Sequence, residues 1–453
     1  MAILPIDGKR YGTPEMLAIF AEQKKIDYQL QIEGAVAISQ AHLNIIPKVA
    51  GRAILSASRS GKITIARVKK IESKTDHDTA ALVQALSEHC SKLARPWIHY
   101  GLTSNDLVDT SNSLQMRDAL NIIEPKMKAL ARSLASMAVK YAKLPAVGRT
   151  HGQHASIIAF GLKFANWAEE TVINLERINQ MRSRTLICKT LGVVGTGSLM
   201  GDNSIAVQKL TAKRLGLKPA HVATQVVPRE RYAEFVFSLA LAGTTLDKMA
   251  VEIRNLQRTE IGEVAEYFAK GQMGSSAVPV KRNPIKSERV SSLARVLRSQ
   301  VGISLENISL WHERDLTNSA NERFLIPTVI ILYDEMLHTM LRILKGLKVN
   351  TKRIRENLYI TKGQIFAEFV LEALIKKGIP RIDAYRDVQR VAFKAVESRT
   401  NYLDALKADK AISSNLTSRE LDVIFDPEKR LGASNRIVRN VVASTMRAIG
   451  KKI

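Results

Sequence analysis

The longest uninterrupted helical pattern in this chain runs from Arg229 to about Lys270, and it constrains the fold more than any other feature. This stretch contains no proline and only two glycines, Gly243 and Gly262. Proline removes a backbone donor and clashes inside a helix, so its absence is compatible with one helix well above the usual length. Such a helix needs packing neighbours along its whole extent. The sequence therefore predicts a long helical bundle that is completed by other copies of the chain.

Other stretches carry apolar residues at alternating spacings of three and four, which is typical of one buried face of a helix. The clearest example contains Met116, Leu120, Ile123, Met127 and Leu130. No stretch shows the sustained alternation of a strand. The fold class is therefore predicted to be all-α, with further helices at 112–142, 156–182, 285–311 and 327–345. The expected domains are an N-terminal helical domain at 1–110, a central long-helix bundle at 111–349 and a C-terminal helical domain at 350–453.

The net charge of +25 is unusual for a chain of 453 residues. A positive surface attracts anions, which include nucleic acids, phosphorylated metabolites and dicarboxylates. The basic residues are spread along the chain, and aromatic residues that could stack on bases make up only 5% of it. We therefore expect no specific nucleic-acid partner. Two interpretations stay open, a small anionic substrate and a surface adapted to the host.

The cysteine content and the first residues bear on location. Only two cysteines occur, Cys90 and Cys188, which is too few for a disulfide framework. The first residues lack the basic and apolar regions of a signal peptide, and the apolar run at 235–246 is too short to span a bilayer. The sequence predicts a cytoplasmic protein without a membrane partner.

The segment 274–284, within a glycine- and proline-bounded loop at 271–284, reads Gly-Ser-Ser-Ala-Val-Pro-Val-Lys-Arg-Asn-Pro. Its glycines allow backbone movement, and Pro279 and Pro284 forbid a helix through the middle. The segment is therefore a mobile loop that carries hydroxyls, a fixed cation and an amide. These groups suit the binding of a carboxylate and the movement of a proton beside it.

Three histidine neighbourhoods form polar turns, at 75–78, 99–106 and 148–154. Each alone favours the interpretation as a capped helix end with a satisfied histidine over that of a functional site. His151 and His154 are three residues apart, but no His-Glu-x-x-His motif or cysteine pair accompanies them. No metal site is predicted.

Taken together, these segments resemble the signature blocks of the fumarase/aspartase superfamily. The loop resembles the pattern Gly-Ser-Ser-x-Met-x-x-Lys-x-Asn, with Val278 in place of methionine, and its Lys-Arg-Asn-Pro ending looks most like the adenylosuccinate lyase family. The histidine blocks follow in the same order and spacing. The resemblance runs from about residue 9 to 440 and includes the segments 10–16, 224–225, 310–315 and 319–323. Ala320 and Asn321 depart from the common Ser-Ser-Ala-Glu-Arg form.

The resemblance implies a three-domain fold whose central bundle forms the core of a homotetramer with shared active sites. It implies β-elimination of fumarate from adenylosuccinate, giving AMP, and from succinylaminoimidazole carboxamide ribotide (SAICAR), giving AICAR. No cofactor is required. Ser275 would be the general base and His151 the general acid. The substrate-binding residues it implies are Arg10, Tyr11, Asp76, His77, Asp78, His99, Thr103, Ser104, Gln225, Ser276, Lys281, Arg282, Asn283, Arg314, Ser319 and Arg323.

Competing functions are separable by motif. The glycines at 192–201 are spaced one residue too far apart for a dinucleotide fingerprint, and no strand–helix–strand pattern surrounds them. No P-loop motif occurs either. An argininosuccinate lyase would share the loop and the acid, but the segments 10–11, 99–104 and 281–284 argue against it. A non-catalytic helical scaffold that binds polyanions is the remaining alternative.

Overall fold

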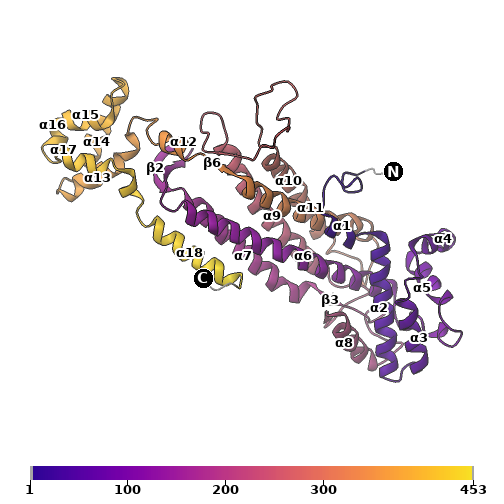
Figure 1. Cartoon of the computed structure of the whole chain (residues 1–453). Coiled ribbons are helices and arrows are strands. Elements are labelled where there is room, and N and C mark those ends of the chain that lie inside the picture. The colour runs from indigo at the N-terminus through magenta and orange to yellow at the C-terminus, as the bar shows by residue number, and fades with distance from the viewer. Residues whose placement is uncertain (1–3, 451–453) are drawn as a thin grey trace. The chain divides into compact units, whose positions relative to one another are not determined.

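The computed structural model describes residues 4–450, and most of them are helical (Figure 1). The prediction of a mostly helical chain is confirmed. By its internal contacts the chain divides into two compact units, each assembled from three separate stretches of sequence. The first unit comprises 1–127, 173–246 and 292–338, and the second comprises 128–172, 247–291 and 339–453. The domain boundaries expected at residues 110 and 349 stay a prediction.

The first unit consists of short N-terminal helices and segments of five long helices. The short elements are α1 (Pro14–Ile19), α2 (Glu22–His42), α3 (Lys48–Ser58), α4 (Ile65–Thr75), α5 (Asp78–Glu88), η1 (Arg95–Trp97), β3 (Ile187–Cys188), α8 (Asn203–Leu215) and β4 (Lys218–Pro219). The long helices are α6 (Ser104–Lys140), α7 (Gly161–Thr185), α9 (Glu230–Leu256), α10 (Ile285–Glu306) and α11 (Ser319–Gly346). The division between the two units falls within each of these five helices.

The long helices pack closely in the first unit because small residues stand at their contacts. A Cβ added to Gly243 of α9 would lie 2.4 Å from a side-chain carbon of Leu297 in α10. Tyr232 and Phe235 on α9 and Tyr333 on α11 are buried in the same core. Figure 1 shows α9, α10 and α11 running side by side. A glycine at position 243 is therefore a packing requirement, although it weakens the isolated helix by roughly 1 kcal/mol.

The second unit contains a hairpin, the signature loop and a set of short C-terminal helices. Its elements besides the long-helix segments are β1 (Pro145–Thr150), β2 (Gln153–Ala159), β5 (Val264–Ala265), β6 (Lys348–Val349), α12 (Thr351–Asn357), η2 (Gln364–Phe366), α13 (Ala367–Lys376), α14 (Arg381–Glu397), α15 (Tyr402–Ala408), α16 (Lys410–Ser413), α17 (Ser418–Ile424), η3 (Pro427–Arg430) and α18 (Ser434–Ala448).

The antiparallel hairpin β1–β2 rests on an apolar cluster of the second unit. Val147 and Ile157 from its two strands pack with Leu358, Phe366 and Leu431. A second cluster joins α13, α14, α15 and α17. These contacts give the hairpin tip, where His151 lies, a fixed support.

The predicted helix from Arg229 to about Lys270 is wrong over its last part, because α9 ends at Leu256. Gly262 adopts a left-handed φ of +62°, and its N–H donates to the carbonyl of Arg258 in a turn. The next residue, Glu263, is fully buried and pairs with Arg149. Tertiary pairing at Glu263 therefore outweighs the helical propensity of the segment.

Other helix boundaries also differ from the sequence pattern. Residues 153–159 form strand β2, so α7 begins at Gly161, five residues later than expected from 156. A Cβ at Gly161 would lie 2.3 Å from the carbonyl oxygen of Ala138, so this helix starts directly against α6. Helix α11 begins before Pro327 and retains this proline in its interior. Burial of Leu325 and Ile326, which directly precede this proline, offsets the loss of the missing donor.

Helix α11 is long and apolar enough to cross a membrane by length and composition. Core helices pass the same test, and 72% of its apolar window is buried within the structure. This burial is typical of a core helix.

Candidate active site

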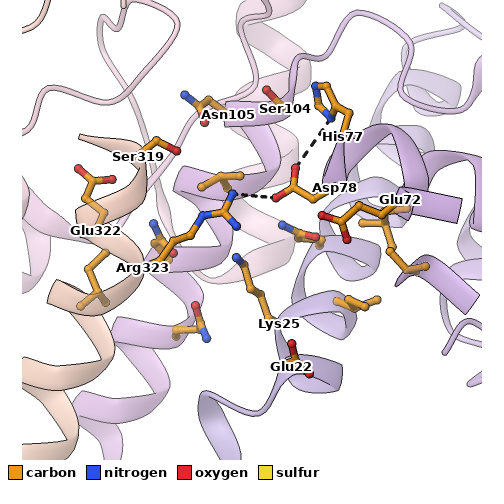
Figure 2. Close-up of a pocket in the computed structure, with 18 of the residues that line it drawn as sticks. Glu22, Lys25, Glu72, His77, Asp78, Ser104, Asn105, Ser319, Glu322 and Arg323 are labelled. Atoms are coloured by element: carbon orange, nitrogen blue, oxygen red, sulfur yellow. Dashed lines mark hydrogen bonds and ion pairs between the residues drawn. The ribbon is translucent and has the colours of Figure 1, made fainter. Parts of the chain in front are cut away.

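The first unit contains a cavity of about 680 Å³ that gathers predicted site residues from three separate parts of the sequence (Figure 2). Helices α2, α4, α5, α6 and α11 contribute its walls. The predicted substrate-binding residues that line it are Asp76, His77, Asp78, Ser104, Arg314, Ser319 and Arg323. A cavity of this size accommodates a small-molecule ligand.

One side of the cavity carries an ion pair between α11 and the start of α5. The guanidinium of Arg323 lies 3.1 Å from a carboxylate oxygen of Asp78. Burial alone raises the pKa of Asp78, but the charge of Arg323 and the hydrogen bond from the Thr79 N–H bring it below its ordinary value. His77 caps α5, since its Nδ1 accepts a hydrogen bond from the N–H of Ala80. Arg323 is therefore held at the cavity wall by a charged partner.

A buried ionic network lies behind the Arg323 side of the cavity. Arg229 donates two hydrogen bonds to Asp109, at 2.8 and 2.9 Å, and two to Glu322, at 2.8 and 3.1 Å. Its guanidinium also stacks over the ring of Tyr232. Glu322 precedes Arg323 on α11, so the network fixes the first turn of that helix relative to α6. Burial raises the pKa of Glu322, although the charge of Arg229 opposes this effect.

Gln225 orients Arg314 and does not line the cavity itself. Its Oε1 accepts a hydrogen bond of 2.7 Å from Arg314. Burial lowers the pKa of Arg314 from its ordinary value. Arg314 therefore reaches the cavity with a neutral hydrogen-bond partner, which leaves its charge available for an anion.

Other predicted binding residues lie outside the lining of this cavity: Arg10, Tyr11, His99 and Thr103. Nδ1 of His99 lies 2.6 Å from Oε1 of Glu33. Burial lowers the pKa of His99, but the adjacent Glu33 carboxylate outweighs this effect and raises it overall. The N–H of Thr103 donates to Asp106 at the start of α6.

The predicted general acid, His151, belongs to the second unit and lies at the tip of the β1–β2 hairpin. His151 and Gly152 form its two-residue loop, with φ of +53° and +76°. This is the pattern of a type I′ turn, which matches the twist of a hairpin. The histidine is exposed, and Arg149 beneath it pairs with buried Glu263 at 2.6 Å. His154, by contrast, is partly buried, and burial together with the charge of Arg149 lowers its pKa.

The signature loop, also in the second unit, connects β5 to α10. The Oγ of Ser275 accepts hydrogen bonds from the N–H groups of Val278, at 3.1 Å, and Ala277, at 3.4 Å. Asn283 donates a hydrogen bond of 3.0 Å to the carbonyl of Gly274. A Cβ at Gly274 would lie 1.9 Å from the Lys281 carbonyl oxygen, so only glycine fits there.

The remaining loop residues are accessible to a ligand. Ser276, Lys281 and Arg282 are exposed, and the guanidinium of Arg282 lies over the ring of Phe268. The carboxylate of Glu266 caps the helix that follows the loop, α10, through hydrogen bonds from Ser287. The loop is thus anchored at its end, while Ser276 and Lys281 are exposed to solvent.

Sequence reasoning missed polar residues that line the cavity from helices and from the turns that precede α9 and α11. These are Glu22, Lys25, Gln29, Lys69, Glu72, Asn105, Asn112, Gln115, Arg229, Asn318 and Glu322. On α6, the polar residues at 105, 112 and 115 recur at helical spacing, and this signal would have placed them on one face. On α2 and α4, isolated charges have the same pattern as a solvated helix face, so no sequence signal distinguishes them. Among the described residues, no cluster of three or more His, Cys, Asp or Glu side chains could hold a metal ion.

Comparisons with known proteins bear on the family of the chain. The chain matches the model of the lyase family over residues 9–298 and that of the adenylosuccinate lyase C-terminus over 363–441. It is 43% identical to an adenylosuccinate lyase of Pyrococcus abyssi, over 98% of each chain. It is 42% identical to one of Methanocaldococcus jannaschii, over 98% of this chain and 96% of that one.

Solved structures of related enzymes share the fold. A fumarate lyase from Mesorhizobium superposes with a TM-score of 0.89 at 30% identity, covering 95% of this chain and 98% of its own. A 3-carboxy-cis,cis-muconate lactonizing enzyme from Pseudomonas putida superposes with a TM-score of 0.90 at 27% identity, covering 98% and 100%. The family matches, the full-length identities and the helical fold together show that the chain belongs to the adenylosuccinate lyase family of the fumarase/aspartase superfamily.

Proposed function

We propose that this chain eliminates fumarate from adenylosuccinate, giving AMP, and from SAICAR, giving AICAR, two reactions of purine biosynthesis. The observation that carries this proposal is the cavity of the first unit, whose lining includes Asp78, Ser104, Arg314, Ser319 and Arg323. Cations and hydroxyls that converge on one cavity suit a ligand with a phosphate and two carboxylates. The full-length similarity to proteins named adenylosuccinate lyase supports this choice of substrate.

In this proposal the arginines hold the phosphate. A guanidinium offers bidentate hydrogen bonds to a phosphate, and Arg314 and Arg323 both line the cavity. Arg323 would exchange part of its contact with Asp78 for the ligand, and Arg314 would keep its bond to Gln225. Ser319, as the first residue of α11, adds the N-terminus of a long helix, which favours a bound anion. Arg10 is assigned to the same phosphate from the family resemblance alone.

The proposed chemistry is acid–base catalysis by groups of the second unit. Ser275 removes the proton next to a substrate carboxylate, and the negative charge that builds on that carboxylate is stabilised by Lys281 and Asn283. The carbon–nitrogen bond then breaks, and His151 protonates the departing nitrogen. Free serine is a weak base, but two backbone N–H groups already donate to the Oγ of Ser275 and would stabilise negative charge on it. Proton transfer between fixed groups requires no metal or cofactor.

We also propose that the active protein is a cytoplasmic homotetramer whose sites take residues from several subunits. The proposed acid and base lie in one unit and the anion-binding cavity in the other. The family resemblance supports sites assembled from more than one copy of the chain. The proposed ligand is a small molecule, with no membrane and no specific nucleic acid as partner.

An absorbance assay tests the reaction. The purified protein is mixed with adenylosuccinate, and the spectral change that accompanies release of fumarate and AMP is followed. Argininosuccinate, under the same conditions, tests the alternative lyase activity. We expect turnover of adenylosuccinate only. Turnover of argininosuccinate alone would assign the other activity, and no turnover of either would favour the non-catalytic scaffold.

A further inference from the structure

Lys25 on α2 lines the same cavity, and among the residues that the structure describes its side-chain ammonium makes neither a hydrogen bond nor an ion pair. Two other cations that line the cavity are paired. Lys69 lies 2.6 Å from Glu22, and Arg323 lies 3.1 Å from Asp78. Asp78, Glu72 and Glu22 lie near enough to favour the charged form of Lys25, but none of them forms an ion pair with it, so its ammonium is left to bind an anion.

The position of Lys25 is unfavourable for a charged group. Burial lowers the pKa of Lys25 from the ordinary value for lysine, and the nearby charge of Arg323 lowers it further, while the carboxylates of Asp78, Glu72 and Glu22 oppose this effect without reversing it. Figure 2 shows the Lys25 side chain pointing toward the guanidinium of Arg323, with Asp78 on the far side of that guanidinium. Two cations directed at one another in a partly buried cavity repel, and an anion bound between them would remove this repulsion.

The geometry also indicates which anion fits. Ser319, which begins α11, belongs to the same helix as Arg323, and Lys25, Arg323 and Ser319 all line the cavity. A helix N-terminus and a pair of cations together favour a multiply charged phosphate. The groups proposed for the reacting carboxylate, Lys281 and Asn283, belong to the signature loop instead.

We infer that Lys25 is a further specificity-determining residue, which donates a charged hydrogen bond to the 5′-phosphate of the substrate beside Arg323 and Ser319. This inference rests on the proposed function and goes beyond it, because it assigns selection of a nucleotide over a nucleoside to a residue of α2. The family resemblance did not point to this residue.

The test compares Lys25→Met with the unchanged protein on two substrates, adenylosuccinate and the matching nucleoside without the phosphate. For the nucleotide, we expect kcat/KM to fall by about ten- to a hundredfold, mainly through KM, as for the loss of a charged hydrogen bond. For the nucleoside, kcat/KM should change little. Lys25→Arg, which keeps the charge, should retain part of the nucleotide preference.

Lys24→Met is the matched control. Lys24 is the preceding residue of α2, is exposed, and lies over the ring of Tyr28 rather than in the cavity. This variant should keep both kcat/KM values. Thermal unfolding and sedimentation of each variant check that the fold and assembly are unchanged.

The outcomes are distinct. Equal losses on both substrates, or no loss on either, would overturn the assignment of Lys25 to the phosphate. An unchanged protein that fails to turn over adenylosuccinate would refute the proposed function instead. Calorimetric titration with AMP and with adenosine then still tests the role of Lys25. Lys25→Met should weaken the binding of AMP but not that of adenosine. Equal AMP binding by Lys25→Met and by the unchanged protein would refute the inference.

Discussion

The ammonium of Lys189 lies 2.7 Å from a carboxylate oxygen of Asp106, and neither side chain is exposed to solvent. Lys189 also donates to the carbonyls of Gly192, at 2.8 Å, and Gln225, at 2.7 Å. Asp106 accepts from the N–H groups of Thr103 and Gly192. One buried ion pair therefore joins the start of α6, the glycine-rich turn and the segment that orients Arg314.

Replacing Lys189 by Met should destabilise the fold strongly. Removal of one partner from a buried pair typically costs about 3–5 kcal/mol, because the other charge stays buried without compensation. We expect a clear drop in the melting temperature, and a partial recovery when Asp106→Asn is added to the same chain. Calorimetry or circular dichroism provides the measurement. If Lys189→Met has the same melting temperature as the unchanged protein, the Lys189–Asp106 pair does not stabilise the fold.

A second prediction concerns pH. The pKa of His99 is raised because the effect of the Glu33 carboxylate exceeds that of burial. A histidine whose pKa is higher in the folded state than in the unfolded state stabilises the fold when it is protonated. This stabilisation is complete below the ordinary histidine pKa of about 6.5, and it is lost as the pH rises through the pKa of the folded state. The melting temperature of the unchanged protein relative to His99→Gln should therefore decrease as pH rises from about 6 to 9.

Glu33→Gln provides the matched control for His99. It removes the charge that raises the pKa of His99 and leaves burial, which lowers it. The pH dependence attributed to His99 should then change sign. If the two variants and the unchanged protein show parallel melting curves across this pH range, the His99–Glu33 pair does not control stability.

The signature loop gives the most direct test of catalysis. Ser275→Ala should fold normally and lose turnover by about a thousandfold or more, as for the loss of a proton-transfer group with its positioning. Ser276→Ala is the matched control, since it removes the neighbouring hydroxyl, and its effect should be milder. Single-turnover rates with adenylosuccinate are the measurement. Near-normal turnover by Ser275→Ala would exclude this serine as the base.

The sequence predicts some of these features well and others poorly, for identifiable reasons. Residues close together in the chain, such as Asp76, His77 and Asp78, reach one cavity because a single turn between α4 and α5 presents them. The local motif is therefore enough to predict that these residues lie together. Arg229 and Lys25, in contrast, have surroundings formed by helices that are distant in the sequence. No local sequence pattern predicts which residues lie near them.

Helix boundaries show the same limit. The apolar pattern identifies α6, α7, α9, α10 and α11, but it does not record where tertiary contacts override propensity. Helix α9 ends at Leu256. In the segment that follows, Gly262 adopts a left-handed conformation and Glu263 forms a buried ion pair with Arg149. The β1–β2 hairpin was missed because its loop, His151-Gly152, is not one of the common hairpin dipeptides.

Assembly can be tested by complementation. If sites are shared between subunits, His151→Ala and Ser275→Ala should each be inactive alone and regain partial activity when unfolded and refolded together. Mixed tetramers would then contain some sites with both groups intact. Each variant refolded by itself is the control. A fully active protein that sediments as a monomer would refute shared sites.

The final prediction separates local from long-range electrostatics. The net charge of +25 produces a field around the whole protein, but exposed charges are screened over about 8 Å at physiological ionic strength. Lys376 and Lys377 lie on or beside α13, are exposed, and pair with Glu372 and Glu420 at 2.6 and 2.7 Å. Neutralising both should leave kcat/KM for adenylosuccinate almost unchanged at physiological salt.

Arg323→Ala, in the same assay, should raise KM strongly, because Arg323 lines the cavity and a guanidinium–phosphate contact is lost there. Raising the salt concentration should then affect the sticking of the protein to polyanions more than its kcat/KM. A large loss of kcat/KM from the two lysine changes, with Arg323→Ala nearly silent, would instead assign substrate capture to the field of the whole protein. The comparison thus decides whether the net charge of the whole protein contributes to substrate capture or acts only in non-specific binding at the protein surface.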